Sequence, residues 1–271
     1  MNTANENAME KYVARVKATR SLLCVGLDSE LANLPNRFLR EPLPQFAFNR
    51  WIIEETHPYA CAYKPNMAFY EAQGMLGWQA LVETMRYLRS EHPDILTICD
   101  AKRGDIGSTS AAYAHAIFDE LGFDAVTLNP YLGGEALQPF LERPDKISII
   151  LCRTSNPQSG ELQDLEIGSQ KLWQVVAQKV AQEWNRHGNC MLVMGATYPQ
   201  ELAQARQLVG DMPFLVPGVG SQGGDLNEVL KVGLNRQGHG LIINSSRAIL
   251  WAKSPQQAAS EVAFFIAEKL G

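Results

Sequence analysis

Eight short apolar runs recur at even intervals along this chain, and most are followed by a stretch in which apolar residues return at helical spacing. Runs of this length, rich in β-branched residues and bounded by turn formers, predict buried strands. The predicted strands span residues 21–28, 60–67, 95–102, 125–131, 147–155, 190–197, 214–220 and 240–247. The predicted helices include residues 75–90, 108–121, 172–186, 200–209 and 255–270.

The order of these elements restricts the fold class to α/β. Strands that are apolar on both faces and alternate with helices must pair in parallel and be covered by those helices. Eight such units in roughly 250 residues predict a closed (β/α)8 TIM barrel. An open doubly wound sheet is the alternative, but the even spacing of the units favours closure. We expect a single domain over residues 1–271, with an N-terminal helical extension at 1–18 and the barrel at about 21–270.

One segment departs from this regular alternation. Residues 154–169 contain Pro157 and Gly160 among polar residues. This composition predicts one long loop after the fifth strand, of the kind that acts as a lid over a site.

The charge balance narrows the range of partners. The chain carries 24 Lys and Arg against 29 Asp and Glu, which gives a formal charge of -5 and a pI near 5.6. A chain without a basic surplus is poorly suited to neutralise a phosphate backbone, so we expect no nucleic-acid partner. Any phosphate bound here is expected on a small molecule.

The N-terminus and the cysteines bear on the compartment. Residues 1–9 are polar and lack the basic start and apolar stretch of a signal peptide. No apolar run is long enough to cross a bilayer, so we expect no membrane partner. The five cysteines lie in apolar runs without CxxC spacing, which is typical of buried reduced thiols. We therefore expect a cytoplasmic protein.

Polar residues concentrate at the C-terminal ends of the predicted strands. In a barrel these ends converge on one mouth, where active sites are built, so the pattern predicts an enzyme. The residues are Asp28, Lys64, Asn66, Asp100, Lys102, Asn129, Thr154, Ser155, Thr197, Gln222, Ser245, Ser246 and Arg247.

The sequence DAKRGD, residues 100–105, ends the third predicted strand. Side chains alternate along a strand, so Asp100 and Lys102 are expected on one face, and a turn at Gly104 would let Asp105 reach back toward them. Lys64 from the neighbouring strand adds a second ammonium. Carboxylates close by favour the charged form of each lysine, which can donate a proton but does not readily form a Schiff base. A purely structural network of ion pairs is the alternative, although buried charges tend to mark functional positions.

A second motif combines the glycine-rich residues 217–224 with residues 244–247, NSSR, one strand later. Glycines allow backbone N–H groups to approach an anion, and Ser246 and Arg247 can hold a phosphate. The loops after strands seven and eight are a common phosphate site in TIM barrels. The same glycines match the dinucleotide pattern GxGxxG, but the next strand ends in Arg247 instead of an acidic residue, so an NADP site stays open as an alternative. A turn without any ligand is the structural alternative.

The five histidines show neither HxH nor HExxH spacing, and most lie away from the predicted strand ends. They predict no zinc site, and we expect no metal. No Ser-His-Asp set or nucleophile elbow is present either.

Four motifs together resemble one family: GLD at residues 26–28, YKPN at 63–66, DAKRGDIGSTS at 100–110 and PGVGSQGGD at 217–225. They are similar to the bacterial orotidine 5'-phosphate decarboxylases, in the branch whose third strand reads DAKRGDI. The resemblance runs in order from the first strand to the last helix. It implies a TIM barrel that makes UMP in de novo pyrimidine synthesis without a cofactor.

The resemblance also implies roles for individual residues. Lys102 matches the lysine that protonates C6 as CO2 leaves, and Asp100 matches the aspartate that faces the substrate carboxylate. Asp105 and Thr109 resemble residues that a homodimer contributes to the neighbouring subunit's site. The other matches hold the substrate: Lys64 and Asp28 near the ribose hydroxyls, Ser155 at the pyrimidine amide, Pro217 at the wall of the base pocket, and Gln222 with Arg247 at the phosphate.

Three other functions compete with this prediction. A metal-dependent sugar-phosphate decarboxylase or aldol synthase shares the pattern DxKxxD, but it calls for an acidic metal ligand where this chain has Lys64. A Schiff-base aldolase needs a neutral lysine, which the carboxylates beside Lys102 oppose. A non-catalytic nucleotide-binding protein would keep the phosphate site without needing Asp100, Lys102 and Asp105 together.

Overall fold

Eight parallel strands close into a barrel in the computed structural model, which describes residues 7–219 and 223–270. Around the barrel the order is β1-β10-β9-β8-β5-β4-β3-β2, so each strand pairs with its neighbours in the chain and the last pairs with the first. The strands are β1 (Leu23–Gly26), β2 (Ala62–Lys64), β3 (Leu96–Arg103), β4 (Ala125–Leu128), β5 (Ile147–Arg153), β8 (Cys190–Met194), β9 (Phe214–Val216) and β10 (Leu241–Ser245). The fold is the predicted (β/α)8 TIM barrel.

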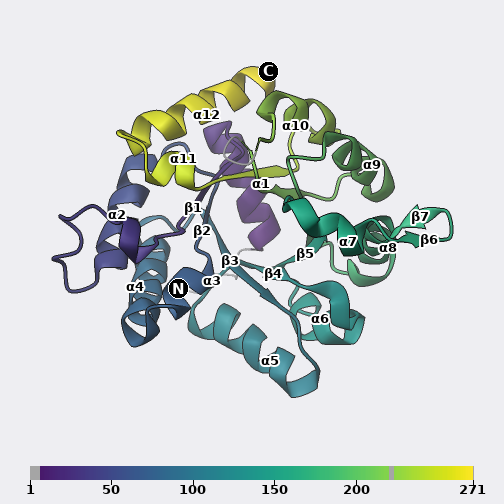
Figure 1. Ribbon diagram of the computed structural model, residues 1–271, viewed down its shortest axis with the longest axis horizontal. Helices are drawn as coiled ribbons and strands as arrows, with labels where there is room; N and C mark the ends of the chain where they lie inside the picture. Colours follow the sequence, from purple (N-terminus) through teal and green to yellow (C-terminus); the bar gives the residue numbers. More distant parts are fainter. Residues whose placement is uncertain (1–6, 220–222, 271) are drawn as a thin grey trace.

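Helices cover the outside of the barrel (Figure 1). The α-helices of the described residues are α1 (Ala8–Thr19), α2 (Pro44–Thr56), α3 (Met67–Glu71), α4 (Gly74–Glu91), α5 (Gly107–His115), α6 (Gly134–Leu141), α7 (Gly160–Gln163), α8 (Leu172–Lys179), α9 (Pro199–Val209), α10 (Leu226–Gly233), α11 (Arg247–Leu250) and α12 (Pro255–Leu270). The five predicted helices are all present. Two of them change to π-helical geometry in their last turn, at Ala116–Glu120 and Val180–Trp184.

Local sequence explains where several helices begin. Pro44, Pro199 and Pro255 are each the first residue of a helix. Proline is favoured there because the first N–H of a helix has no internal partner and the fixed φ suits the helix. The Asp225 carboxylate caps α10 by accepting the N–H groups of Asn227 and Glu228. These starts fix the lengths of the loops that surround the barrel mouth.

The N-terminal helix α1 packs across one end of the barrel, as its place at the centre of Figure 1 shows. Tyr12 is fully buried, and its hydroxyl donates to the carbonyl of Leu241 at 2.9 Å, at the start of β10. Lys11 pairs at 2.9 Å with Asp124, just before β4. The helix therefore covers the N-terminal ends of the strands and leaves the opposite mouth open.

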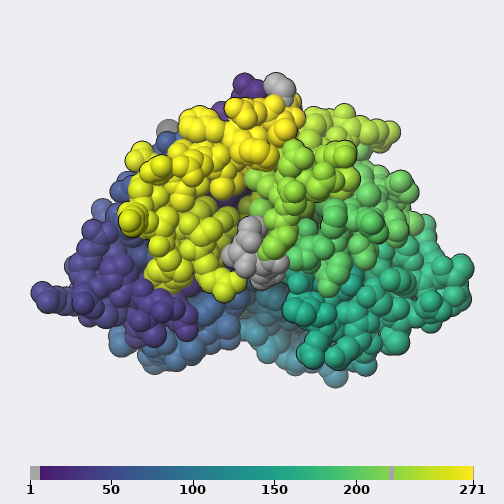
Figure 2. Space-filling model, turned by 45° about the horizontal axis from the view of Figure 1, so that its top comes forward, coloured from purple at the N-terminus to yellow at the C-terminus, as the bar shows by residue number. Residues whose placement is uncertain are grey.

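In the space-filling view, the C-terminal segments lie against the N-terminal third on one side and the β8–α10 region on the other (Figure 2). This arrangement follows from the pairing of β1 with β10. The strands form the centre of one apolar core, in which all five cysteines are buried as free thiols, as predicted. Burial raises the pKa of Cys61, Cys152 and Cys190 to about 12, so these thiols stay protonated.

The segment at residues 154–169 is not the single irregular loop that the sequence predicted. It contains a 3-10 turn at Pro157–Ser159, the short helix α7, and the first strand of a hairpin made by β6 (Glu166–Ile167) and β7 (Gln170–Lys171). The reason is Arg153, at the end of β5. Its buried guanidinium donates to Gln163 at 3.2 Å and Asp164 at 3.0 Å, and so folds the segment onto the barrel.

Candidate active site

A cavity of about 760 Å³ opens at the C-terminal ends of the strands. Seven of the eight strands end earlier than predicted, and in five of these, β1, β2, β5, β9 and β10, residues just past the strand end line this cavity. The cavity is lined by eight of the predicted site residues: Asp28, Lys64, Asp100, Lys102, Ser155, Pro217, Ser246 and Arg247. The structure thus brings together side chains that are up to 219 positions apart, as from Asp28 to Arg247.

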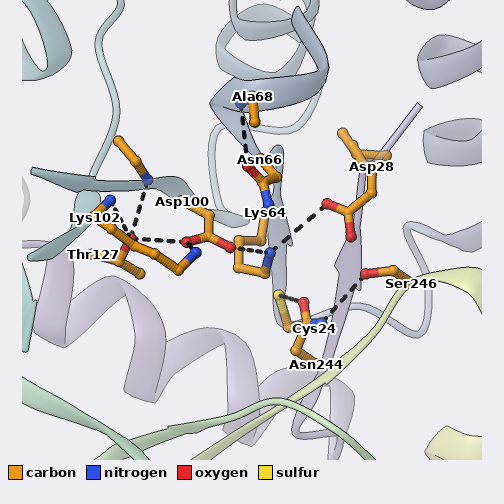
Figure 3. A network of polar contacts seen from close by, with 12 residues as sticks. Cys24, Asp28, Lys64, Asn66, Ala68, Asp100, Lys102, Thr127, Asn244 and Ser246 are labelled. Carbon is orange, nitrogen blue, oxygen red and sulfur yellow. Dashed lines mark hydrogen bonds and ion pairs between the residues drawn. The ribbon is translucent and has the colours of Figure 1, made fainter. Parts of the chain in front are cut away.

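Lys64, Asp100 and Lys102 form a continuous line of charges across the floor of the cavity (Figure 3). The Asp100 carboxylate receives Lys64 Nζ on Oδ2 at 2.9 Å and Lys102 Nζ on Oδ1 at 2.6 Å. Lys64 is 4% exposed, whereas the Lys102 side chain is 49% exposed. Asp100 is therefore shared between a buried cation and one that faces the open cavity.

Burial and charge oppose each other in setting the protonation of this network. Burial alone lowers the pKa of Lys64, but the carboxylates of Asp100 and Asp28 outweigh it and raise that pKa above its usual value. Burial likewise favours the neutral form of Asp100, but Lys64 and Lys102 together hold its pKa far below the usual range. Lys64 and Asp100 are thus both ionised at neutral pH.

Asp28 completes the line at its far end. Its Oδ1 lies 3.9 Å from Lys64 Nζ, which is too long for a hydrogen bond. Within the described ranges this oxygen is buried and accepts no hydrogen bond. Because a buried acceptor without a donor is costly, the arrangement suits a ligand hydroxyl that would supply the donor.

The end of β3 is less regular than simple alternation predicts. Asp100 and Lys102 do contact each other, but β3 bulges between Cys99 and Arg103, and Lys102 has a left-handed φ of 50°. Thr127 on β4 faces the bulge and also lines the cavity. Sequence reasoning did not select Thr127, although a hydroxyl inside the apolar strand AVTL was a signal for it.

Asp105 and Thr109 do not join this network within one chain. The Asp105 carboxylate accepts the N–H of Ile106 at 2.7 Å, and Thr109 is exposed in the first turn of α5. Gly104 does not bring Asp105 back toward Asp100 and Lys102 as expected, and the positive φ in this segment belongs to Gly107. Gly104 is needed for a different reason: a Cβ there would lie 2.6 Å from the carbonyl oxygen of Asn129.

The predicted phosphate site is present in part. Pro217, Gly218, Ser246 and Arg247 line one side of the cavity, and Arg247 is exposed at the start of α11. Gly218 has a φ of 94°, a backbone conformation that favours glycine. Gln222 lies outside the described residues. Arg247 has no carboxylate within ion-pair distance in residues 7–219 and 223–270, so its guanidinium is free to bind an anion.

Residues 154–164, which we call the strap, form another wall of the cavity. Gln163 accepts the N–H of Thr154 at 2.9 Å and donates to the hydroxyl of the same residue at 2.9 Å, which closes the strap on itself beside Ser155. Gln163 and Asn156 line the cavity and were missed, because the predicted loop contained no periodic signal. Three predicted strand-end residues, Asn129, Thr197 and Ser245, do not line it.

The described residues contain no cluster of three or more His, Cys, Asp or Glu side chains that could hold a metal ion. None of the helices in that part of the chain is both long and apolar enough to span a membrane.

Residues 21–262 match the model of the orotidine 5'-phosphate decarboxylase / HUMPS family. A relative from Herpetosiphon aurantiacus named orotidine 5'-phosphate decarboxylase is 51% identical over 259 residues, which is 94% of each chain. A relative of the same name from Cellvibrio japonicus is 46% identical over 97% of each chain.

Comparison with solved structures leads to the same family. The structure of Leishmania donovani OMP decarboxylase is 39% identical, covers 97% of this chain and 98% of its own, and superposes with a TM-score of 0.87. Leishmania donovani UMP synthase is 41% identical with a TM-score of 0.91, and the match covers 98% of this chain and 57% of that one. With a matching family model, a matching barrel and near full-length relatives, the chain belongs to the orotidine 5'-phosphate decarboxylase / HUMPS family.

Proposed function

We propose that this protein converts orotidine 5'-phosphate to UMP and CO2 in pyrimidine nucleotide synthesis, with Lys102 as the proton donor and without a cofactor. The observation that carries the proposal is the pairing of the Lys102 ammonium with Asp100 at 2.6 Å, at the open face of the cavity. The relatives named orotidine 5'-phosphate decarboxylase support the choice of substrate.

The reaction needs a cation beside the carbon that loses CO2. The bond between C6 and the carboxylate breaks, and its electron pair stays on C6 as a carbanion. A fixed ammonium stabilises the developing charge and then transfers a proton, which forms the new C6–H bond. Lys102 becomes a neutral amine and recovers its proton from solvent, to which its side chain is 49% exposed.

The neighbouring charges hold this ammonium in place. Asp100 binds Lys102 through one oxygen and Lys64 through the other, so its carboxylate cannot rotate without losing one of the two pairs. The unpaired oxygen of Asp28 and the ammonium of Lys64 are suited to the ribose hydroxyls. We assign Asp100 to orienting Lys102, and Asp28 and Lys64 to the sugar.

The two ends of the substrate fit the remaining walls. Arg247 and Ser246 on one side, with the backbone at Gly218, form a polar corner for the phosphate, and we include Gln222 from the sequence motif. Pro217 and Ser155 line the part of the cavity that we assign to the pyrimidine. Because the phosphate binds far from C6, its binding energy can contribute to positioning the reacting carbon.

We propose a homodimer in which Asp105 and Thr109 complete the partner's site. Two observations support this: neither residue lines the cavity of its own chain, and Ile106 between them is 64% exposed. Tyr131 in the neighbouring loop is 80% exposed. Exposed apolar side chains grouped around polar residues are typical of an interface between subunits.

Mixed dimers test the crossing directly. Lys102→Ala and Asp105→Ala homodimers should each be nearly inactive. After co-refolding at equal concentrations, about half of the dimers are mixed and one site in each of these carries neither defect, so activity should return to about a quarter of wild type. If confirmed heterodimers are no more active than the parents, each site is built from a single chain.

Loss of the ultraviolet absorbance of orotidine 5'-phosphate, followed with and without EDTA, tests the activity. We expect turnover that EDTA does not change. Activity that EDTA abolishes would favour the metal-dependent sugar-phosphate decarboxylases and aldol synthases instead. Binding of UMP without turnover would indicate a nucleotide-binding protein. The cytoplasm is the compartment that we propose, because the five free thiols persist there.

A further inference from the structure

The Thr127 hydroxyl makes three hydrogen bonds at the centre of the charged network (Figure 3). It donates to Asp100 Oδ1 at 2.9 Å and accepts the backbone N–H groups of Ala101 and Lys102, both at 3.0 Å. The side chain is only 2% exposed. A hydroxyl has one donor and two acceptor sites, so the bonding capacity of this group is fully used.

These bonds fall on the bulge at the end of β3. Cys99 pairs with Val126 and Arg103 pairs with Leu128, so the three residues from Asp100 to Lys102 face Thr127 alone. The ladder of strand hydrogen bonds is interrupted there, and the Thr127 hydroxyl takes the place of the missing backbone acceptor for two N–H groups.

The bulge places Lys102 in an unfavourable backbone conformation. Its φ of 50° lies in the left-handed region, which Lys102 and Arg20 alone adopt among the described residues other than glycine. A residue with a Cβ persists there only when its surroundings fix it, and such positions cluster at functional sites. Thr127 fixes this one through the N–H of Lys102 itself, while its donated hydrogen bond orients the Asp100 carboxylate.

We propose that Thr127 is a positioning residue for the decarboxylation: it locks the left-handed backbone of Lys102 and the orientation of Asp100, and thereby aims the ammonium at C6. This inference rests on the proposed function of Lys102. Without the hydroxyl, two N–H groups and one carboxylate oxygen lose a partner in a buried place. The bulge is then free to relax, and a displacement of a reacting group by about 1 Å can cost on the order of a hundredfold in rate.

Thr127→Val removes the hydroxyl and keeps the shape of the side chain. We expect kcat for orotidine 5'-phosphate to fall by about tenfold to a hundredfold. The dissociation constant for UMP, measured by calorimetry, should change by less than about threefold, because Thr127 acts on the lysine and not on the phosphate corner. Thr127→Ser restores the hydroxyl and should return kcat to within about threefold of wild type.

Thr97→Val is the matched control. Thr97 is also buried, at 3% exposed, and its hydroxyl likewise donates to a carboxylate, Asp124 at 2.8 Å, and accepts a backbone N–H, from Asp124 at 3.1 Å. It lies near the opposite end of the barrel, on β3 beside the start of β4. We expect Thr97→Val to lower the melting temperature while kcat stays at the wild-type value.

The inference is overturned if Thr127→Val keeps kcat within threefold of wild type, or if Thr127→Ser loses as much as Thr127→Val. An equal loss of UMP affinity and kcat/KM would also overturn it. If Thr127→Val does not fold, Thr127→Ser and Thr127→Ala provide the same comparison of presence and absence of the hydroxyl. A crystal structure of Thr127→Val distinguishes this inference from the proposed function, because an unchanged Lys102 φ and Lys102–Asp100 distance contradict it whatever the substrate is.

Discussion

Replacing Lys64 by Met measures how much a buried ammonium contributes to the folded state. Lys64 is 4% exposed, and its Nζ lies 2.9 Å from Asp100 Oδ2 and 3.9 Å from Asp28 Oδ1. Methionine keeps most of the apolar stem and removes the charge. Asp100 then keeps only Lys102, whose side chain is half exposed, and Asp28 loses its ion-pair partner.

The expected cost follows from the burial of the pair. Removing one partner of a buried ion pair costs about 3 to 5 kcal/mol, because the remaining charge is left unpaired. Asp100 keeps its 2.6 Å bond to Lys102, so we expect the lower end, about 3 kcal/mol. Lys179→Met is the control: that lysine pairs with Glu183 at a similar 3.0 Å, but the two side chains are 47% and 56% exposed. Its loss should cost no more than about 0.5 kcal/mol.

The assay is urea unfolding at pH 7, followed by tryptophan fluorescence at one fixed protein concentration, since a dimer makes stability depend on concentration. Lys64→Met should shift the midpoint strongly at an unchanged slope, and Lys179→Met should leave it nearly unchanged. If Lys64→Met costs no more than Lys179→Met, burial does not determine the strength of these pairs and the reasoning is wrong.

Three further predictions concern other parts of the site. The pKa of Asp100 is held below its ordinary value near 3.8, so the ionised carboxylate stabilises the fold at pH values above about 4, and this contribution is lost as the pH falls further. Urea unfolding at a series of pH values should therefore show a steeper loss of stability below about pH 4 in wild type than in Asp100→Asn. Arg247→Ala should weaken UMP binding by about 1.5 to 3 kcal/mol and uridine binding far less, and equal losses in calorimetry would mean that Arg247 does not contact the phosphate. Arg153→Met should expose the strap to limited proteolysis under native conditions, because the buried guanidinium holds Gln163 and Asp164; cleavage at the wild-type rate would contradict that role.

The fold followed from the sequence because a barrel strand carries its signal locally. Each of the eight strands is a short apolar run, and its partners are set by chain order once the barrel closes. The meeting of Asp28, Lys64, Asp100 and Arg247 could be predicted for the same reason, since all parallel strands end at one mouth.

The bulge in β3, the structure of the strap and the place of Asp105 could not be predicted, because they depend on contacts that leave no periodic signal in the sequence. The bulge at Lys102 is hydrogen-bonded to the hydroxyl of Thr127, which lies 25 residues along the chain. The structure of the strap depends on a buried arginine, Arg153, whose partners lie in a stretch that appears irregular in sequence. Asp105 could not be assigned from alternation, because β3 bulges before Arg103 and ends there.

The rate of UMP formation by Lys102→Ala at saturating orotidine 5'-phosphate tests the central claim most directly. We expect the rate to fall by at least about a hundredfold, since the proton donor and the cation beside C6 are both lost. UMP should still bind with nearly wild-type affinity, because Arg247 and the phosphate corner are unchanged. A turnover rate within tenfold of wild type would contradict the assignment of Lys102 as the proton donor.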